Sequence, residues 1–265
     1  MKLSFLKYSP TQNMTLLFPE PLPREQQAAA AAALIAYEGV YAEQAGFIEP
    51  PTLPGARLRL QMAGGEFCGN ATMCLGAYLA REEGLNIGES RNYLLEVSGA
   101  DAPLCCKVET LGENEWRGEV TLPGTARLTS VTLPDGRCFP LVCLPGISHI
   151  IAPQSRLSMA EAEKLLPQLC RELETDALGI MLTKDESCRE ITPLVYVKEI
   201  DSLYPERGCA SGTAAVGAYL ANRNGKEMTM DVAQPGGVLQ VCACPEGALR
   251  IAGKVKLVAE GEAYI

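Results

Sequence analysis

Short runs in which hydrophobic and polar residues alternate dominate the chain. A period near two is typical of half-buried β-strands, and Pro and Gly between the runs mark turns. The runs predict strands at 3–8, 14–18, 57–62, 93–97, 118–122, 138–144, 179–183, 191–197 and 237–243. Helical spacing is rarer and predicts helices at 24–38, 71–83, 158–174 and 212–223. Many strands and few helices, without regular β-α-β alternation, favour an α+β fold with mostly antiparallel sheets.

One segment of the chain occurs twice. GGEFCGNATMCLGAYLAREEG at 64–84 returns as ERGCASGTAAVGAYLANRNG at 206–225. With Cys68 aligned on Cys209, eight of the 17 positions from Cys68 to Gly84 are identical. Each copy is followed by a strand and then by a cysteine-bearing strand. We therefore expect two similar halves, residues 1–124 with Cys68 and residues 125–265 with Cys209, and leave the last roughly ten residues free to return to the N-terminal half.

The composition narrows the class of protein. The 265 residues are 47% hydrophobic and 21% charged, which is typical of a globular chain, and the net charge of −9 disfavours nucleic acid or an anionic membrane as a partner. The most apolar run, residues 28–37, is half the roughly 20 residues that a membrane-spanning helix needs. The first ten residues lack the apolar core of a signal peptide. These features predict a cytoplasmic protein without a membrane segment.

Cysteine is abundant, and its count is odd. Eleven cysteines without an export signal indicate free thiols in a reducing compartment. The pairs Cys105–Cys106 and Cys242–Cys244 lack the second pair of ligands that a zinc site needs, and His149 is the only histidine. We therefore expect no metal site.

The repeated segment places a cysteine just before a helix in both copies. Backbone N–H groups in the first turn of a helix have no intrahelical partner, and the helix dipole is positive there. A thiol at that end should have a pKa below its usual value of about 8.5. The N–H groups of Gly69 and Asn70, and those of residues 211–213 (Ser211, Gly212 and Thr213), form a candidate site for a carboxylate.

Two such cysteines have a natural use in inverting a stereocentre. Inversion needs a base on one face of a carbon and an acid on the opposite face. Two residues of the same kind can exchange these roles between the forward and the reverse reaction. With Cys68 as thiolate and Cys209 as thiol, or the reverse, one removes the α-proton of an amino acid and the other returns a proton from behind. This hypothesis explains the duplication, the glycines and the cysteines together.

The turns CGN at 68–70 and CASGT at 209–213 resemble the two catalytic turns of the diaminopimelate epimerase family. That resemblance implies a cofactor-independent amino-acid racemase or epimerase, built as two pseudo-symmetric α+β halves that each wrap a sheet around a central helix. It extends to YSPTQNMTLL, where Asn13 stands at the position of the family's substrate asparagine. It also covers SHIIAP at 148–153, where His149 takes the place of the family's Asn-Pro-His.

Several further pieces resemble the histidine racemases of staphylopine-type metallophore synthesis: SPTQNMT, EQAGFIE, GGEFCGNATM, GIML, PLVY, EIDSL, CASGTA and QPGG. The resemblance implies conversion of L-histidine to D-histidine, a small-molecule substrate and no cofactor. It matches Glu43 to an acidic position in those racemases. Related racemases are often dimers, so a homodimer stays open, although no stripe of residues demonstrates an interface.

The chain also departs from the diaminopimelate epimerases. Met62, and Ile180 or Met181, stand near positions where those enzymes have asparagine. Their Glu-Arg pair appears as Glu199 followed by Ile200. Loss of a charged clamp disfavours a substrate with a second carboxylate.

Each candidate has a simpler structural alternative. Asn13 could bond its own backbone in a turn, His149 could be a buried core residue, and Glu43 a solvated turn carboxylate. Glu206, three residues before Cys209, either contacts substrate or complements the helix dipole.

Other functions also remain open. One is a racemase or epimerase of another amino acid, and a second is a hydrolase that uses Cys68 with His149 and leaves Cys209 idle. A thiol-rich or metal-binding module is a third.

Overall fold

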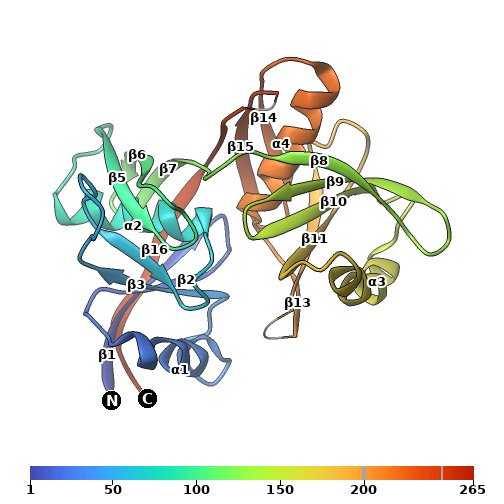
Figure 1. Ribbon diagram of the computed structural model, residues 1–265. Helices are drawn as coiled ribbons and strands as arrows, with labels where there is room; N and C mark the ends of the chain where they lie inside the picture. Colours follow the sequence, from blue (N-terminus) through green and yellow to red (C-terminus); the bar gives the residue numbers. More distant parts are fainter. Residues whose placement is uncertain (199–200, 246) are drawn as a thin grey trace. The chain divides into compact units, whose positions relative to one another are not determined.

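The computed structural model describes residues 1–198, 201–245 and 247–265. These residues form two compact units. Unit 1 comprises residues 1–123 and 252–265, and unit 2 comprises residues 124–251. The α+β class expected from the sequence is confirmed, since the described residues hold four helices and many strands (Figure 1).

Unit 1 is a sheet that closes on itself around one helix. The order of its strands is β1-β2-β3-β4-β5-β6-β7-β16, and β16 also pairs with β1. Helix α2 packs against the strands from β1 to β7, and eleven of its residues are buried. The elements are β1 (Lys2–Pro10), β2 (Thr15–Phe18), α1 (Arg24–Ile35), β3 (Gln44–Glu49), β4 (Arg59–Met62), α2 (Gly69–Glu82), β5 (Ser90–Val97), β6 (Leu104–Gly112), β7 (Glu115–Thr121) and β16 (Leu249–Tyr264), which begins in unit 2.

Small residues allow the strands of unit 1 to approach α2 closely. A side chain at Gly76 would lie 2.6 Å from Val108 Cγ2 and 2.8 Å from Cys106 Sγ. The glycine that both copies of the repeat share therefore marks the place where the helix touches the sheet. A helix buried on nearly every side is apolar all round, which explains why α2 shows no strongly polar face in the sequence.

Unit 2 combines a six-stranded sheet with a helix on each of its two sides. The sheet order is β13-β12-β11-β10-β9-β8. Helix α3 packs on β11 and β12. Helix α4 packs on β9, β10 and β11 and also on the hairpin β14–β15. The elements are β8 (Arg127–Thr132), β9 (Cys138–Leu144), β10 (Ile147–Pro153), α3 (Met159–Glu172), β11 (Ala177–Thr183), β12 (Ile191–Val197), β13 (Ser202–Pro205), α4 (Ala210–Asn224), β14 (Met228–Gln234) and β15 (Gly237–Ala243).

Alternation along β10 and β11 decides what each helix meets. Ile150 and Ile180 belong to the apolar cluster beneath α3. Because successive side chains of a strand point to opposite faces, the odd-numbered residues His149, Gly179 and Met181 lie on the α4 side. The six-stranded sheet thus offers α4 a face that carries a histidine and a glycine at adjacent register positions.

The ends of the helices follow their sequence signals with small differences. Ser158 caps α3 in a capping box with Glu161, as the sequence predicts. Helix α1 ends at Ile35 rather than at residue 38, because Ala36 is extended and the N–H of Val40 bonds back to Leu34 O.

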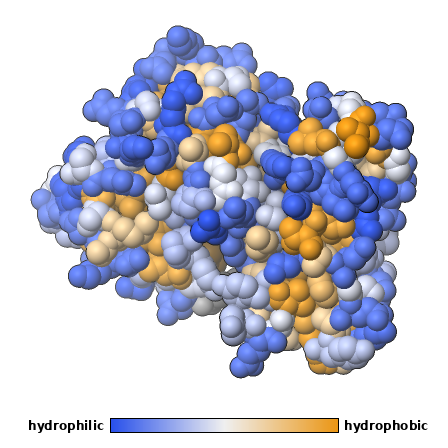
Figure 2. Space-filling model, turned by 180° about the vertical axis from the view of Figure 1, so that it is seen from behind, coloured by the Kyte–Doolittle hydropathy of each residue, from blue (hydrophilic) through white to orange (hydrophobic). Residues whose placement is uncertain are grey.

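None of the helices in the described part of the chain is long and apolar enough to cross a membrane. Figure 2 shows hydrophobic residues in small groups among hydrophilic ones, which is ordinary for a folded surface. The two termini lie side by side in unit 1 (Figure 1), where the N–H of Ile265 donates to Met1 O.

Candidate active site

The two repeated cysteines are the N-cap residues of α2 and α4. Both helices begin two residues before the predicted starts, at Gly69 and at Ala210, because the cysteine side chain itself caps the helix. Cys68 Sγ accepts the N–H of Ala71 at 3.3 Å, and Cys209 Sγ accepts the N–H of Gly212 at 3.3 Å. Each sulfur therefore lies at the positive end of a helix, as the sequence predicts.

A threonine fixes each turn in the same way. The hydroxyl of Thr72 donates to Cys68 O at 2.7 Å, and the hydroxyl of Thr213 donates to Cys209 O at 2.7 Å. The two threonines occupy identical positions of the repeat. The two copies thus share the geometry of the turn around the sulfur as well as the packing residues of the helix.

In unit 1 three separate stretches of chain meet at Cys68. Its thiol donates to Gln44 Oε1 at 2.6 Å. The N–H groups of Glu43 and Gln44 both point to Met14 O, at 2.8 and 3.2 Å. Met14 follows Asn13, so the turn between β1 and β2, the start of β3 and the Cys68 turn lie together. Of the predicted residues, unit 1 brings Asn13, Glu43 and Cys68 into one neighbourhood.

Asn13 has a buried side chain that the fold leaves unpaired. It is 0% exposed, and within the described residues neither Oδ1 nor Nδ2 has a hydrogen-bond partner. Thr11 and Gln12, just before it, have φ of 50° and 61°, a left-handed conformation that costs energy in residues other than glycine. Its side chain does not make the local bond that the structural alternative requires. Buried polar groups are seldom left unsatisfied, so Asn13 is a candidate for binding a ligand.

In unit 2 a glutamine ties the Cys209 turn to the hairpin β14–β15. Gln234 Oε1 accepts the N–H of Cys209 at 2.7 Å, and Gln234 Nε2 donates to the hydroxyl of Thr213 at 2.7 Å. The N–H of Gly236 also donates to Arg207 O at 2.7 Å. The turn that carries Cys209 is therefore held from both its backbone and its threonine.

His149 lies beside the same turn. Its Nε2 is 3.0 Å from Ser211 Oγ, and Ser211 Oγ is 3.6 Å from Cys209 Sγ. The imidazole is 0% exposed, and burial lowers the pKa of His149 to about 3, so the ring is neutral. Unit 2 thus brings together the predicted residues His149, Cys209 and Ser211, with Gly212 and Thr213 in the first turn of α4.

Burial governs the charge of Cys209. The expectation of a lowered thiol pKa is wrong for this residue. Burial raises its pKa well above the usual value, the carboxyl group of Glu206 adds to the increase, and Ser211 and the N–H of Gly212 oppose it. Two hydrogen-bond donors at a helix end do not offset the loss of water around a side chain that is 3% exposed. Burial also raises the pKa of Glu206 to about 7.

Comparison with known proteins assigns the family. The family model described as the histidine racemase CntK N-terminal domain matches residues 2–264. This chain belongs to that family. It is 32% identical to a histidine racemase of Fusobacterium nucleatum over 99% of this chain and 97% of the relative, and 31% identical to one of Staphylococcus aureus over 99% and 98%.

Solved structures show the same fold at lower identity. A predicted epimerase from Pseudomonas aeruginosa covers 98% of this chain and 98% of its own, with a TM-score of 0.71 and 15% identity. A hydroxyproline epimerase from Agrobacterium vitis covers 99% and 92%, with a TM-score of 0.71 and 10% identity. The family expected from the sequence and the enzyme class, an isomerase that racemises or epimerises amino acids, are confirmed.

Two residues that hold the cysteines are absent from the sequence-based predictions. Gln44 and Gln234 lie within the quoted pieces EQAGFIE and QPGG, but no local pattern assigns an amide to a sulfur or to a distant N–H group. The nearest signal lay in their positions along the chain. Gln44 directly follows the predicted residue Glu43, and Gln234 lies just before the second cysteine-bearing strand. Glu43 is exposed, and Glu199 lies outside the described residues.

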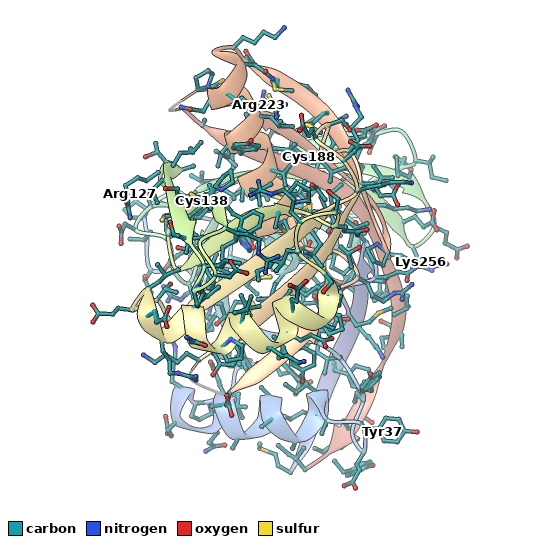
Figure 3. The ribbon with its side chains drawn as sticks, turned by 90° about the vertical axis from the view of Figure 1, so that its right-hand side faces the viewer. Tyr37, Arg127, Cys138, Cys188, Arg223 and Lys256 are labelled. Atoms are coloured by element: carbon teal, nitrogen blue, oxygen red, sulfur yellow. The ribbon has the colours of Figure 1, made fainter. Side chains whose placement is uncertain are left out.

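The remaining cysteines do not gather into a site. None of the eleven cysteines, all within the described ranges, forms a disulfide, as expected. Cys74 is fully buried in α2 and packs in the interior of unit 1. Cys138, on β9, is exposed, and Cys188, in the loop after β11, is buried (Figure 3). Across the described ranges, no group of three His, Cys, Asp or Glu side chains is placed to hold a metal.

Proposed function

We propose that this protein interconverts L-histidine and D-histidine without a cofactor, using Cys68 and Cys209 as its two proton carriers. The observation that carries the proposal is the pair of N-cap cysteines, which have matching sulfur and threonine hydrogen bonds in the two units. Two groups that must exchange the roles of acid and base need similar chemistry, and the repeat supplies it.

The proposed reaction moves one proton off the substrate and another onto it. One cysteine, as thiolate, takes the α-proton and becomes a thiol, and the electron pair stays on the α-carbon. The other cysteine, as thiol, gives its proton to the opposite face and becomes a thiolate. The next turnover in the reverse direction begins with the roles exchanged. The mechanism requires the Cys68 turn and the Cys209 turn to approach the α-carbon from opposite faces.

The first turns of α2 and α4 are proposed to hold the substrate carboxylate and to stabilise the carbanion. The N–H groups involved belong to Gly69, Asn70, Ser211, Gly212 and Thr213. Gly212 has no room for a larger residue, because a Cβ atom there would lie 2.2 Å from Met181 Sδ. Glycine at this position therefore lets Met181 of β11 pack directly against the first turn of α4.

Several residues are proposed to recognise the rest of the amino acid. The unpaired amide of Asn13 can bond the ammonium or carboxylate group of a substrate, and Glu43 can meet a cationic one. Glu206 lies beside Cys209, and Glu199 keeps the role that the family resemblance implies. We assign His149 to the same group because of its place beside Ser211.

Histidine is the proposed substrate because both named relatives are histidine racemases that align over nearly the whole chain. Met62 and Met181 are buried apolar residues near positions where the family resemblance implies polar partners for a second carboxylate, and Ile180 lies on the α3 side of the sheet. We further propose that the fold is the diaminopimelate epimerase type, with halves that arose by duplication. The D-histidine would supply an opine-type metallophore in the cytoplasm, where thiols stay reduced.

The decisive experiment is incubation with L-histidine in D₂O, without pyridoxal phosphate, followed by NMR of the α-proton and by optical rotation. The wild type should exchange the α-proton and lose optical rotation. Cys68→Ser and Cys209→Ser should each abolish inversion, whereas Cys105→Ser, at an exposed cysteine of β6, should leave it unchanged. Near-full activity in either of the first two variants would refute the two-base mechanism.

The same assay separates the alternatives. A panel of other L-amino acids identifies the substrate if histidine does not exchange. The hydrolase alternative needs His149 to activate Cys68, but the bonds described here join Cys68 to Gln44 and His149 to Ser211. Release of ammonia or of a peptide fragment, with no α-proton exchange, would favour that alternative.

A further inference from the structure

A row of polar atoms runs from the sheet of unit 2 to the sulfur of Cys209. His149 Nε2 is 3.0 Å from Ser211 Oγ, and Ser211 Oγ is 3.6 Å from Cys209 Sγ. The row joins β10 to the first turn of α4 across 62 positions of sequence. Hydrogen bonds of this kind have a direction, and the direction decides whether the sulfur is the acceptor or the donor at the end of the row.

The surroundings of His149 set that direction. A neutral imidazole has one N–H group and one bare nitrogen, and the ring is neutral because burial lowers the pKa of His149 to about 3. Nδ1 is buried and has no hydrogen-bond partner within the described residues. The proton therefore belongs on Nε2, where the oxygen of Ser211 accepts it. The hydroxyl hydrogen of Ser211 is then free to point at Cys209 Sγ.

The strand opposite His149 is built to seat the ring. His149 is paired with Gly179 in the register of β10 and β11. A Cβ atom at Gly179 would lie 2.3 Å from Nδ1 and 2.8 Å from Cε1 of His149. Glycine weakens the middle of a strand, and its use there usually marks a close approach. Here the imidazole occupies the space that a side chain of β11 would fill.

The two cysteines meet different polar partners. Cys209 Sγ accepts the N–H of Gly212 and lies at the end of the row from His149. Cys68 instead donates its S–H to the carbonyl oxygen of Gln44, an acceptor that favours the thiol. Each sulfur accepts a backbone N–H, and the difference lies in the side chains, a hydroxyl of Ser211 beside Cys209 and an amide oxygen beside Cys68. The carboxyl group of Glu206 and burial oppose the thiolate of Cys209, and Ser211 works against them.

We propose that His149 and Ser211 are positioning residues that act in series, His149 Nε2–H to Ser211 Oγ–H to Cys209 Sγ, to stabilise the thiolate of Cys209. In this role His149 acts on the sulfur of Cys209 through Ser211. This assignment rests on the proposed function for its purpose in catalysis. The hydrogen-bond series can be tested on the resting protein without any substrate.

The test measures the thiolate of Cys209 directly. Alkylation by iodoacetamide is followed from pH 6 to pH 11, and tryptic peptides are analysed by mass spectrometry. Residues 208–223 form a tryptic peptide with Cys209 as its only cysteine, whereas Cys68 lies in the peptide 60–81. The midpoint of the pH profile reports the thiol pKa, and the plateau reports access to the sulfur. Cys68 in the same molecule is the internal control.

Ser211→Ala should raise the midpoint of Cys209 by about one pH unit, so that alkylation near neutral pH slows roughly tenfold. His149→Leu should produce the same change, because the hydroxyl of Ser211 is then no longer oriented. Ser211→Thr keeps a hydroxyl and His149→Gln keeps a donor, and both should stay near the wild-type midpoint. The midpoint of Cys68 should not move in any variant.

The double variant Ser211→Ala with His149→Leu separates a series from two independent effects. If His149 acts through Ser211, the double variant should match Ser211→Ala alone. Additive shifts would overturn the series, and so would an unchanged midpoint in folded Ser211→Ala. Equal shifts of Cys68 and Cys209 would show general loosening and would also overturn it. A selective Cys209 shift in a protein that exchanges no α-proton would support the series and refute the proposed racemase.

Discussion

Replacing Asn13 with leucine should make the protein more stable and inactive. Asn13 is 0% exposed, and two of its polar atoms are unpaired within the described residues. Leaving a buried donor or acceptor unsatisfied costs about 1–3 kcal/mol for each group. Leucine has the same branching at Cγ and no polar atom, so the variant removes this cost for both atoms.

The size of leucine opposes part of the gain. Extra volume in a packed interior costs about 1–3 kcal/mol. We therefore expect the free energy of unfolding to rise by about 2 kcal/mol, the relief of about 4 kcal/mol for both groups less about 2 kcal/mol for overpacking. Racemisation should fall to background, because the substrate loses its amide partner. Urea denaturation monitored by circular dichroism gives the first quantity, and α-proton exchange gives the second.

Thr15 offers a matched control two residues along the chain. It is also 0% exposed, but its hydroxyl donates to Asn13 O at 3.1 Å. Thr15→Val removes a satisfied bond and should destabilise the protein by about 1 kcal/mol. If Asn13→Leu destabilised the protein as much as Thr15→Val does, Asn13 would be a structural residue, and the argument from its unpaired amide would be refuted.

Three further outcomes follow from the structure. Gly212→Ala should lower racemisation by tenfold or more while α4 stays folded. The new Cβ would lie 2.2 Å from Met181 Sδ, and relief of that overlap costs about 1–3 kcal/mol. Unchanged activity would contradict the close packing of the turn. The pH profile of racemisation should show an ionisation near pH 7 that Glu206→Gln removes, since burial raises the pKa of Glu206 to about 7; persistence of that ionisation would assign it to another group. Glu96, buried among Arg59, Thr52 and Leu53 N–H, has a pKa lowered to about 2 from 4.5. Its stabilising charge is present above pH 4.5 and is lost as the pH falls toward 2, so wild-type stability should drop more in that window than the stability of Glu96→Gln, which keeps only the losses from the other carboxyl groups.

Much of the fold was predictable from local patterns. Alternation predicted most strands, and the repeat predicted where α2 and α4 stand, because strand periodicity, helix capping and glycine spacing all act within a few residues. Bounds were less accurate. The helices that start at Gly69 and Ala210 were expected at 71 and 212, since a cysteine that caps a helix through its sulfur is not among the usual capping signals.

The sequence by itself determined the pair of cysteine turns, since Cys68 and Cys209 stand out through a repeat that needs no coordinates. It also singled out Asn13 and His149 as candidates. Only the tertiary structure decided what surrounds them. Contacts such as Cys68 with Gln44, or His149 with Ser211, join positions that are 24 and 62 residues apart, and no short-range pattern encodes them.

Burial, too, is a property of the folded chain. A helix end favours a thiolate, and the sequence shows that end plainly, but the environment of Cys209 is set by strands and a hairpin from elsewhere in unit 2. The loss of water there outweighs the N–H groups and raises the thiol pKa. The tertiary structure therefore reversed the expected direction of the Cys209 pKa shift, because desolvation depends on everything that packs around a group. It left Cys209 at the helix end, because helix capping depends only on neighbours in the chain.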